Sequence, residues 1–390
     1  HAWTRLAGNG DFSTGFFSLI FGVLLVPLAY RLATSVFDRK VGLLAALLVA
    51  CSPFHLWYSQ EVRMYTLGAV LGIGALSAVV SLLSAPPERP PAWSRLAVYA
   101  VCGALGLWML YYFAFLLVAI NLMVLAWWLV RQRRARTGWS WLGRWLLAQG
   151  VILLLYAPWI AVAWRQATQP PVPPWRGFTG LGALLLESWS ALSLGQSAEP
   201  AWAWPALLLV AALFGLGLFY KPEGSERRDL GWMVRGFLAG CIFLPLFLIY
   251  TASFVTPLFH VRYVFPYSMP FYIFVAAGLA WLGRRWRPAL VLALAALALF
   301  AGISIHAYHT DPHYAGDDPR AATGFLAERW RPGDAILINA GYAYTAPLIY
   351  WDGDPIAWRG RLVQYDGPPS QGGPVMVQTG TVDGAPSLGW

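Results

Sequence analysis

Charge is scarce in this sequence. Only 12% of its 390 residues are Asp, Glu, Lys or Arg, whereas soluble globular proteins carry about 25%. Hydrophobic residues make up 58%, and they come in long blocks. This composition excludes an ordinary soluble domain and is typical of a protein with several membrane-spanning helices.

Acidic residues are fewer than basic ones, and the formal net charge is +9. A basic protein can bind nucleic acid, but here the Lys and Arg residues cluster at the ends of apolar runs. We therefore expect membrane lipids, and no nucleic acid, as partners. The 22 Trp and 18 Tyr suit a protein with many helix ends at membrane–water interfaces.

Metal and nucleotide motifs are also missing. The three cysteines, at 51, 102 and 241, have no C-x-x-C or Cys/His spacing, so we expect no metal site and no obligatory disulfide. The segment 306–313 holds three His and one Asp, but it follows a helix end and contains a proline, which favours a wet linker. No G-x-x-x-x-G-K-[ST] motif supports an ATP-driven pump. We expect no cofactor, and the sequence leaves open any dependence on a divalent cation.

Ten apolar stretches have, or nearly have, the 17–25 residues or so that a membrane-spanning helix needs. They lie at 15–32, 41–57, 65–83, 95–110, 113–130, 145–164, 204–220, 232–252, 267–283 and 289–305. The run from 95 to 130 has no charge after Arg95 and is too long for one helix, so we expect a turn at LWMLYYF. The predicted fold of residues 1–305 is an all-α polytopic membrane domain with about ten transmembrane helices.

Lys and Arg are distributed unevenly among the connections between these stretches. The connections at 31–40, 84–95, 131–144, 221–235 and 284–287 contain seventeen of them, and the opposite connections contain five. Because cytoplasmic loops carry the excess of Lys and Arg, the first group is predicted to be cytoplasmic. The segments 52–65, 165–203 and 253–267 then lie on the outer face, together with all residues after 305.

Residues 306–390 are expected to form a small soluble α/β region on that outer face. PRAATGFLAERW has helical spacing, RPGD is typical of a turn, and AILINA is typical of a short strand. From residue 352 onward Gly, Pro and Asp dominate without periodicity. We therefore expect this region to be incomplete.

Polar residues gather in two short outer-face segments. The first, SPFHLWYSQEVRMY at 52–65, is flanked on both sides by apolar runs, where charges are costly unless they are paired or face a wet cavity. The second is SFVTPLFHVRYVFPY at 253–267. An arginine beside aromatic residues at a membrane surface suits a phosphate, because its planar fork binds two phosphate oxygens at once. Arg63 and Arg262 therefore suggest a site for a lipid-linked phosphate or pyrophosphate.

Simpler interpretations of these residues exist. Arg63 can be an interfacial anchor or a partner of Glu61, and Arg262 can extend its charge to the membrane surface from an apolar helix end. Glu187, in LLLESW, can be a solvated residue of an amphipathic helix on the outer face.

The stretch SPFHLWYSQEVRMYTL resembles a segment of bacterial membrane glycosyltransferases of the GT-C superfamily. These are relatives of the dolichyl-phosphate-mannose–protein mannosyltransferases and the lipid A aminoarabinose transferases (glycosyltransferase family 39 type). VRYVFPYSMPFYIFVAAGLAWL is similar to a helix of this family, and DDPRAATGFLAERWRPGDAILINA to the start of its outer-face domain. The resemblance covers most of residues 1–345. The family usually has Arg, His and Trp where this chain has Gly15, Tyr111 and Pro319.

The resemblance implies that a sugar is transferred from a polyprenyl-phosphate carrier to a lipid, glycan or protein acceptor on the outer face of the bacterial cytoplasmic membrane. Arg63 would contact the phosphate of the donor, and Glu61 would orient Arg63 or a sugar hydroxyl. Arg262 and Tyr263 would approach from the other side. The predicted donor site is completed by Tyr58, Gln60 and His260.

The catalytic base is not among these residues. In the family, the acidic base lies in the first outer loop, which the resemblance places upstream of His1. We therefore expect residues 1–390 to lack the first helix and the first outer loop of the transferase domain, and to be inactive alone. The catalytic residue stays unknown.

Two other classes of protein fit the same residues. A flippase or transporter of lipid-linked sugars would use the same phosphate site, but no inverted repeat or matched pair of broken helices is evident. A non-catalytic membrane scaffold with an outer domain would need no site at all. A further helix and an acidic outer loop encoded upstream of His1 would favour the transferase.

The charge asymmetry gives a testable topology. A single cysteine introduced at position 370 should react with a membrane-impermeant thiol reagent in intact cells, and one at position 138 should not, because the 131–144 connection is predicted to be cytoplasmic. Labelling at 138 with none at 370 would contradict this topology.

Overall fold

The computed structural model describes residues 2–8, 10–86, 90–135, 139–168, 177–222, 228–314, 318–331, 334–338, 345–351, 357–359, 375–378, 380–382 and 385–387. The chain divides into two units. The larger comprises His1–Arg165 and Arg176–Asp311, and the smaller comprises Gln166–Trp175 and Pro312–Trp390. Each is described by itself below.

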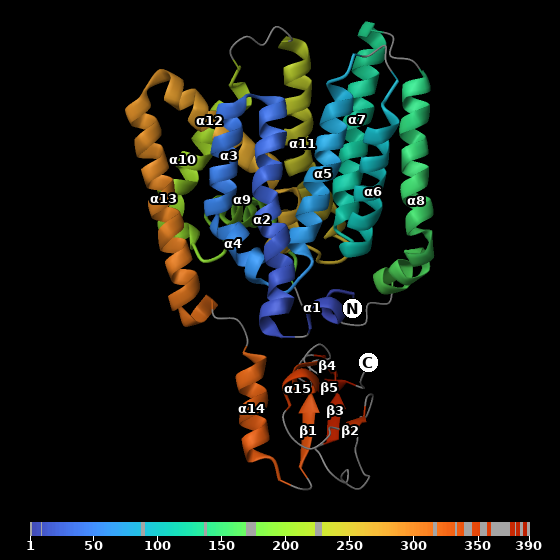
Figure 1. Ribbon diagram of the computed structural model, residues 1–390, viewed down its shortest axis with the longest axis vertical. Helices are drawn as coiled ribbons and strands as arrows, with labels where there is room; N and C mark the ends of the chain where they lie inside the picture. Colours follow the sequence, from blue (N-terminus) through green and yellow to red (C-terminus); the bar gives the residue numbers. More distant parts are fainter. Residues whose placement is uncertain are drawn as a thin grey trace. The chain divides into compact units, whose positions relative to one another are not determined.

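The larger unit is a bundle of helices (Figure 1). Its elements are α1 (Ala2–Ala7), α2 (Asp11–Val36), α3 (Arg39–Cys51), α4 (Pro53–Gln60), α5 (Tyr65–Leu83), α6 (Trp93–Met109), α7 (Phe113–Ala135), α8 (Trp139–Thr168), α9 (Leu181–Leu194), α10 (Pro200–Phe219), α11 (Arg228–Ala252), the 3₁₀ helix η1 (Val261–Tyr267), α12 (Met269–Arg285) and α13 (Arg287–Thr310). Each of the ten apolar stretches expected to be helical coincides with one of these helices or with a bent pair of them.

The expected number of membrane spans needs a correction. Among the described residues, seven helices are long and apolar enough to cross a membrane, or nine if each of two bent pairs is one span. Helix α6 has 17 residues and is about 26 Å long at 1.5 Å per residue, short of a hydrocarbon core of about 30 Å. The larger unit is thus an all-α multi-span membrane bundle, but a count of ten spans exceeds what the length and composition of the described helices support.

The first bent pair breaks at Ser52. Helices α3 and α4 meet there at 54°. Pro53 disfavours helical backbone in the residue before it, and Ser52 is extended, with φ −71° and ψ 124°. The Ser52 hydroxyl accepts a hydrogen bond from the His55 backbone N–H at 3.3 Å, which caps the new helix. The dipeptide Ser-Pro therefore turns one apolar run into two helices.

The second bent pair consists of η1 and α12, which meet at 69°. Pro266 lies within η1, and Pro270 stands in the first turn of α12. Helix α4 lies at the end of the bundle opposite the α2–α3 turn (Figure 1), and η1 packs against the first half of α5. The two bends therefore bring short helices to the ends of α3 and α12.

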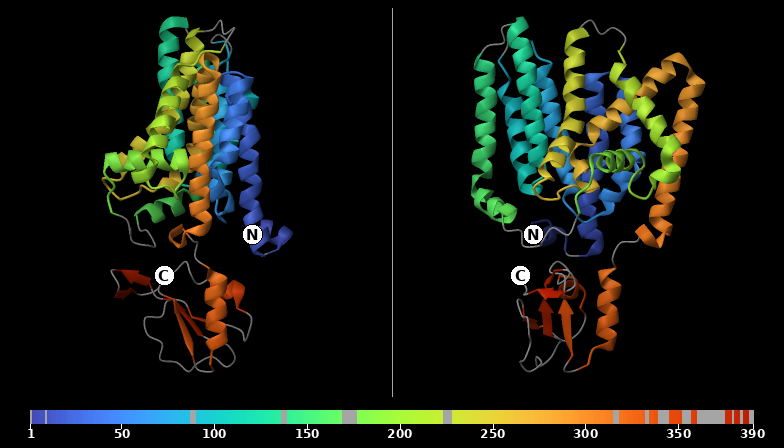
Figure 2. Two further views of the ribbon diagram at one scale, coloured as in Figure 1. Left: turned by 90° about the vertical axis from the view of Figure 1, so that its left-hand side faces the viewer. Right: turned by 180° about the vertical axis from the view of Figure 1, so that it is seen from behind.

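Helix α9 is the amphipathic helix expected around Glu187. It has 14 residues and lies across the long helices rather than along them (Figure 2). Glu187 stands on its exposed side, as expected for an amphipathic helix. Gly195 ends α9 with φ +82°, a left-handed conformation that favours glycine.

Helices α10 and α12 cross in close contact because each contributes a glycine. A Cβ atom added to Gly217 would collide with the backbone carbonyl of Phe274, and one added to Gly278 would collide with that of Leu213. Small residues allow helix backbones to approach in this way inside membranes.

A buried polar network joins α6, α7 and α8. The Asn121 amide nitrogen donates to Gln149 Oε1 at 3.0 Å and to the Leu117 carbonyl at 2.9 Å. Asn121 Oδ1 accepts from Trp145 Nε1 at 2.9 Å, and the Tyr99 hydroxyl donates to Gln149 at 3.2 Å. These groups satisfy one another, as polar groups between membrane helices must.

The smaller unit contains η2 (Pro312–Tyr314), α14 (Pro319–Arg329), α15 (Thr345–Tyr350) and the strands β1 (Ala335–Ile338), β2 (Ala357–Arg359), β3 (Val375–Gln378), β4 (Gly380–Val382) and β5 (Ala385–Ser387). Strands β1, β3 and β2 pair in parallel in that order, with Ala335 and Ala357 both opposite Val375, and β4 pairs with β5 antiparallel. Asp318 caps α14 by accepting from the Ala321 N–H at 2.8 Å. An extracytoplasmic α/β domain over 306–390, and its incompleteness, stay predictions.

The glycine crossing predicts a matched pair of stabilities. Gly217→Ala should lower the free energy of unfolding by about 1–3 kcal/mol, the usual cost of an added methyl in a filled contact. Gly215→Ala should leave stability unchanged or raised, because nothing lies within 4 Å of an added Cβ there. Thermal unfolding of both purified variants measures the difference, and equal melting temperatures would contradict the close crossing.

Candidate functional site

The structure brings the two predicted polar segments together. Glu61 follows the last residue of α4 and is extended, with φ −77° and ψ 126°, so the chain leaves the helix there. The charges of Arg63 and Arg262 both act on the Glu61 carboxyl, although Arg262 is about 200 residues further along the chain. We name Glu61, Arg63 and Arg262, with Tyr58, Tyr65, His260 and Tyr263, the arginine cluster.

Glu61 and Arg63 form an ion pair in this cluster. Arg63 Nε lies 3.4 Å from Glu61 Oε1, and the two side chains are 50% and 30% exposed, respectively. The interpretation of Arg63 as a partner of Glu61 is therefore confirmed. Because solvent screens such a pair, it contributes at most about 1 kcal/mol to stability. The ion pair does not hold Arg63 strongly, and the Arg63 guanidinium keeps an open side.

Arg262 is partly buried and more constrained. Its Nε donates to His260 Nδ1 at 3.2 Å, and its guanidinium lies within hydrogen-bonding reach of the Tyr65 hydroxyl. The guanidinium carbon also lies 5.9 Å from the centre of the Tyr263 ring. His260 therefore fixes the position of Arg262, in addition to accepting the Arg262 backbone N–H as the cap of η1.

Tyr263 connects the cluster to the turn between α6 and α7. Its ring stacks on that of Tyr112, with centroids 3.5 Å apart and planes at 10°. The Tyr112 hydroxyl donates to the Leu258 carbonyl at 2.6 Å. The turn expected at LWMLYYF thus exists and supports the site, and the neighbouring Tyr111 hydroxyl accepts from Trp159 Nε1 at 2.9 Å.

Tyr58 is buried, and its ring packs edge-on against that of Tyr65, with centroids 5.0 Å apart. Gln196 Nε2 donates to the Tyr58 hydroxyl at 2.9 Å. Gln60, the last residue of α4, is exposed, and in the described part of the chain no hydrogen bond joins its side chain to the other predicted residues. The structure therefore brings together all the predicted donor-site residues except Gln60.

Burial raises the pKa of the Glu61 carboxyl above its ordinary value, and the positive charges of Arg63 and Arg262 oppose that shift. Glu61 is thus a partly buried carboxylate that interacts with two guanidinium groups. Such a group is positioned to orient a cation and to accept a hydrogen bond, and it is not free in solvent.

Several residues of this site were not in the predicted set. Gln196 arrives on the α9–α10 connection, which is held by Ser304: the Ser304 hydroxyl donates to the Leu194 carbonyl at 2.6 Å, and Ser197 Oγ donates to the Ser304 carbonyl at 2.8 Å. The negative charge of Glu61 also reaches Tyr308 of α13.

Beneath the cluster, His55 lies among aromatic rings rather than at the polar face. Its ring centroid is 4.7 Å from that of Phe265 and 5.2 Å from that of Tyr272. Neither ring nitrogen has a hydrogen-bond partner among the described residues. His55 therefore belongs to the packed floor of the site.

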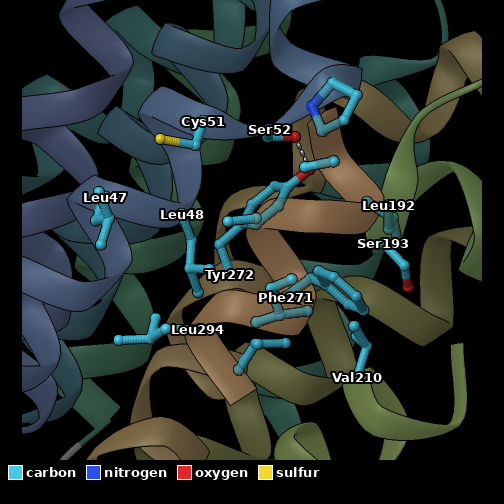
Figure 3. A pocket seen from close by; sticks show the side chains of 15 residues that line it. Leu47, Leu48, Cys51, Ser52, Leu192, Ser193, Val210, Phe271, Tyr272 and Leu294 are labelled. Carbon is cyan, nitrogen blue, oxygen red and sulfur yellow. Dashed lines mark hydrogen bonds between the residues drawn. The ribbon is translucent and has the colours of Figure 1, made fainter. Parts of the chain in front are cut away.

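An apolar cavity of about 240 Å³ opens beside this floor (Figure 3). Helices α3, α9, α10, α12 and α13 line it with residues such as Leu48, Leu192 and Phe271. One wall carries the hydrogen bond between the Ser52 and Tyr272 hydroxyls, whose oxygens are 2.8 Å apart. A second apolar cavity, of about 470 Å³, lies between α9, α10 and α11, and Leu192 lines both.

No group of three His, Cys, Asp or Glu residues within the described ranges could hold a metal ion. The three cysteines are free thiols, of which Cys51 is exposed and Cys241 is buried. A cofactor-free and metal-free site stays an expectation.

Residues 1–162, somewhat less than half of the chain, match a family whose description is dolichyl-phosphate-mannose-protein mannosyltransferase. The match confirms the resemblance to membrane glycosyltransferases that was predicted from the sequence. No curated protein sequence matches the chain significantly.

Solved structures share the fold. The crystal structure of ArnT from Cupriavidus metallidurans in the apo state matches with a TM-score of 0.57 at 12% identity, over 90% of this chain and 72% of that one. ArnT bound to undecaprenyl phosphate gives a TM-score of 0.56 at 12% identity with the same coverage. The oligosaccharyltransferase AglB from Archaeoglobus fulgidus, in complex with an inhibitory peptide and a dolichol-phosphate, gives 0.50 at 13%, over 90% of this chain and 54% of AglB. At such identities the likeness concerns the fold.

The raised pKa of Glu61 predicts a pH-dependent difference in stability. Because the folded state favours protonated Glu61, its stability falls as the pH rises above the ordinary value of 4.5. The melting temperature of Glu61→Gln relative to the parent protein should therefore increase between pH 4.5 and pH 7. Glu187→Gln, at an exposed position, is the control and should show no such trend. A relative melting temperature that falls with pH would mean that the two arginines outweigh burial.

Proposed function

We propose that this protein transfers a sugar from a polyprenyl-phosphate-linked donor to an acceptor on the outer face of the cytoplasmic membrane. The single observation that carries the proposal is the convergence of Arg63 and Arg262 on Glu61 at one end of a membrane bundle. The family match over residues 1–162 supports the glycosyltransferase class.

The phosphate of the donor would bind between the two guanidinium groups. Arg63 is half exposed and only weakly held, so it can turn its fork towards a phosphate. Arg262 is fixed by His260 and the Tyr65 hydroxyl, and would supply a preoriented positive charge. Preorganised donors of this kind stabilise the negative charge that develops on a leaving phosphate.

The lipid part of the donor would enter the apolar cavity between α3, α9, α10, α12 and α13 (Figure 3). Its lining is almost entirely hydrocarbon, and its Ser52–Tyr272 wall packs against His55, at the floor of the site. Similar folds have been solved with undecaprenyl phosphate and with dolichol-phosphate. A phosphate at the arginine cluster and an isoprenoid chain along the bundle are therefore compatible.

Glu61 would orient Arg63 or accept a hydrogen bond from a sugar hydroxyl. The acceptor is a lipid, a glycan or a protein, and the acidic group that deprotonates its hydroxyl is not assigned to a residue of this chain. A transfer reaction requires such a base, whereas movement of the intact lipid-linked sugar does not. Product analysis thus distinguishes a transferase from a flippase.

The donor site predicts the effect of removing each arginine. Arg63→Ala and Arg262→Ala should each weaken binding of a polyprenyl-phosphate donor by about 1.5–3 kcal/mol, the typical value of a hydrogen bond to a charged group. Arg63→Lys should recover little, because an ammonium lacks the planar fork. Arg287→Ala, an exposed arginine at the start of α13, is the matched control and should bind normally.

Donor binding can be measured by titration of the purified protein with a polyprenyl-phosphate sugar, and transfer by mass spectrometry of acceptors. An unchanged affinity for the donor in both alanine variants would indicate that these arginines are interfacial anchors and not phosphate ligands. Translocation of intact donor without any glycosylated product would favour the flippase.

A further inference from the structure

Arg235, near the start of α11, is a buried cation that is only 5% exposed. Among the described residues, neither Nε nor Nη1 has a hydrogen-bond partner. Buried guanidinium groups normally find a carboxylate or several carbonyls, because an unpaired charge away from water is costly.

Aromatic rings surround this guanidinium. Its central carbon lies 5.0 Å from the centre of the Phe37 ring and 5.4 Å from that of Trp232. Such stacking offsets part of the free-energy cost of removing the guanidinium from water. It leaves the N–H groups in the plane of the guanidinium without an acceptor. The remaining donors suit an oxyanion.

The one neighbouring carboxylate that the structure describes is already engaged. Asp38 accepts from the Tyr220 hydroxyl at 2.6 Å and from the Val41 N–H at 2.9 Å, and it lies 3.8 Å from Arg284 Nη2. The Arg284 guanidinium in turn lies over the Tyr220 ring, 4.5 Å from its centre. The contacts of Asp38 are thus to Tyr220, Val41 and Arg284, and among the described residues it makes no ion pair with Arg235.

The position of this region along the membrane axis indicates the source of the anion. The α2–α3 turn, the α12–α13 turn and the start of α11 lie at one end of the bundle (Figure 1), opposite the arginine cluster. Trp232 is 41% exposed and contacts Phe219, which is 65% exposed. Exposed aromatic pairs at helix ends lie at the depth of lipid headgroups, and basic loops attract anionic lipids there.

We propose that Arg235 is the centre of a second anion site, which binds the phosphate of an anionic phospholipid at the end of the bundle that carries the basic connections. Arg235 Nε and Nη1 have almost no accessible surface without the lipid, so binding requires the exposed Trp232 side chain to move aside and open these donors to the phosphate oxygens. Phe37 stays stacked on the guanidinium, and Trp232 then contacts the first methylenes of the lipid. The site is independent of the donor-phosphate site at the opposite end.

The test uses the purified full chain, stripped of lipid in a neutral detergent and titrated with phosphatidylglycerol. Phosphatidylcholine is the lipid control, and inorganic phosphate tests for a free anion. Native mass spectrometry reports the affinity of the first bound lipid, and thermal unfolding reports its stabilisation. We expect phosphatidylglycerol to bind more tightly than phosphatidylcholine and to raise the melting temperature.

Two variants distinguish bidentate binding by the Arg235 guanidinium from nonspecific attraction by surface charge. Arg235→Lys keeps the charge but loses the fork, and should weaken phosphatidylglycerol binding about tenfold. Arg39→Lys, at an exposed position of the same end, is the matched control and should leave it unchanged. Equal affinities of the two variants, or stabilisation by inorganic phosphate that matches that of the lipid, would overturn the proposal.

Arg235→Met separates lipid binding from a purely structural role. If Arg235 serves to bind a lipid phosphate, the substitution should leave the melting temperature in lipid-free detergent unchanged or raised, because it removes a buried charge that has no partner there. The same variant should gain no stability from phosphatidylglycerol. A melting temperature that falls equally with and without lipid would show that Arg235 only stacks on its aromatic neighbours, and would overturn the site.

Discussion

A charge next to hydrocarbon must be paired or must face water, and this constraint governs where the helices of this protein bend. Apolar runs on both sides of residues 52–65 would carry Glu61 and Arg63 towards the membrane if they continued as one helix. The break at Ser52 and Pro53 starts the short helix α4 instead, and α4 ends at Gln60, so both charges stand in the connection to α5. The bend before α12 places Arg262 in the short helix η1 and outside the membrane-length run. The arginine cluster is therefore a product of two interrupted helices.

The helical content was predictable because it depends on local patterns. Long apolar runs separated by basic turns predict spans, and each expected run is helical. The number of spans was overestimated, since periodicity does not report length across the membrane: α6 is too short alone, and the run 41–57 is bent at Ser52. The amphipathic helix expected around Glu187 is α9, but its bounds and its orientation across the long helices were not predictable, because a 14-residue apolar segment carries no signal for either.

The candidate site was predictable in part. Arg63, Glu61 and Tyr58 lie within one quoted stretch, and chemistry alone points to them. Arg262, His260 and Tyr263 were predicted from a second stretch. That this stretch lies beside the first depends on the tertiary structure, which no local sequence pattern reports. Gln196 could not be found, because its place depends on Ser304 of α13 holding the α9–α10 connection. Arg235 was read only as one of many basic residues in a loop; its burial is visible in the fold alone.

The α9–α10 connection has a thermodynamic consequence. Leu192 lines both apolar cavities, and four residues later Gln196 holds the Tyr58 hydroxyl. Gly195, with its left-handed backbone, and the two hydrogen bonds to Ser304 leave this connection little freedom to absorb a shift of α9. If the proposed donor binds as described, binding of its lipid chain in a cavity and binding of its phosphate at the arginine cluster would be thermodynamically coupled. Each would then strengthen the other by the same free energy.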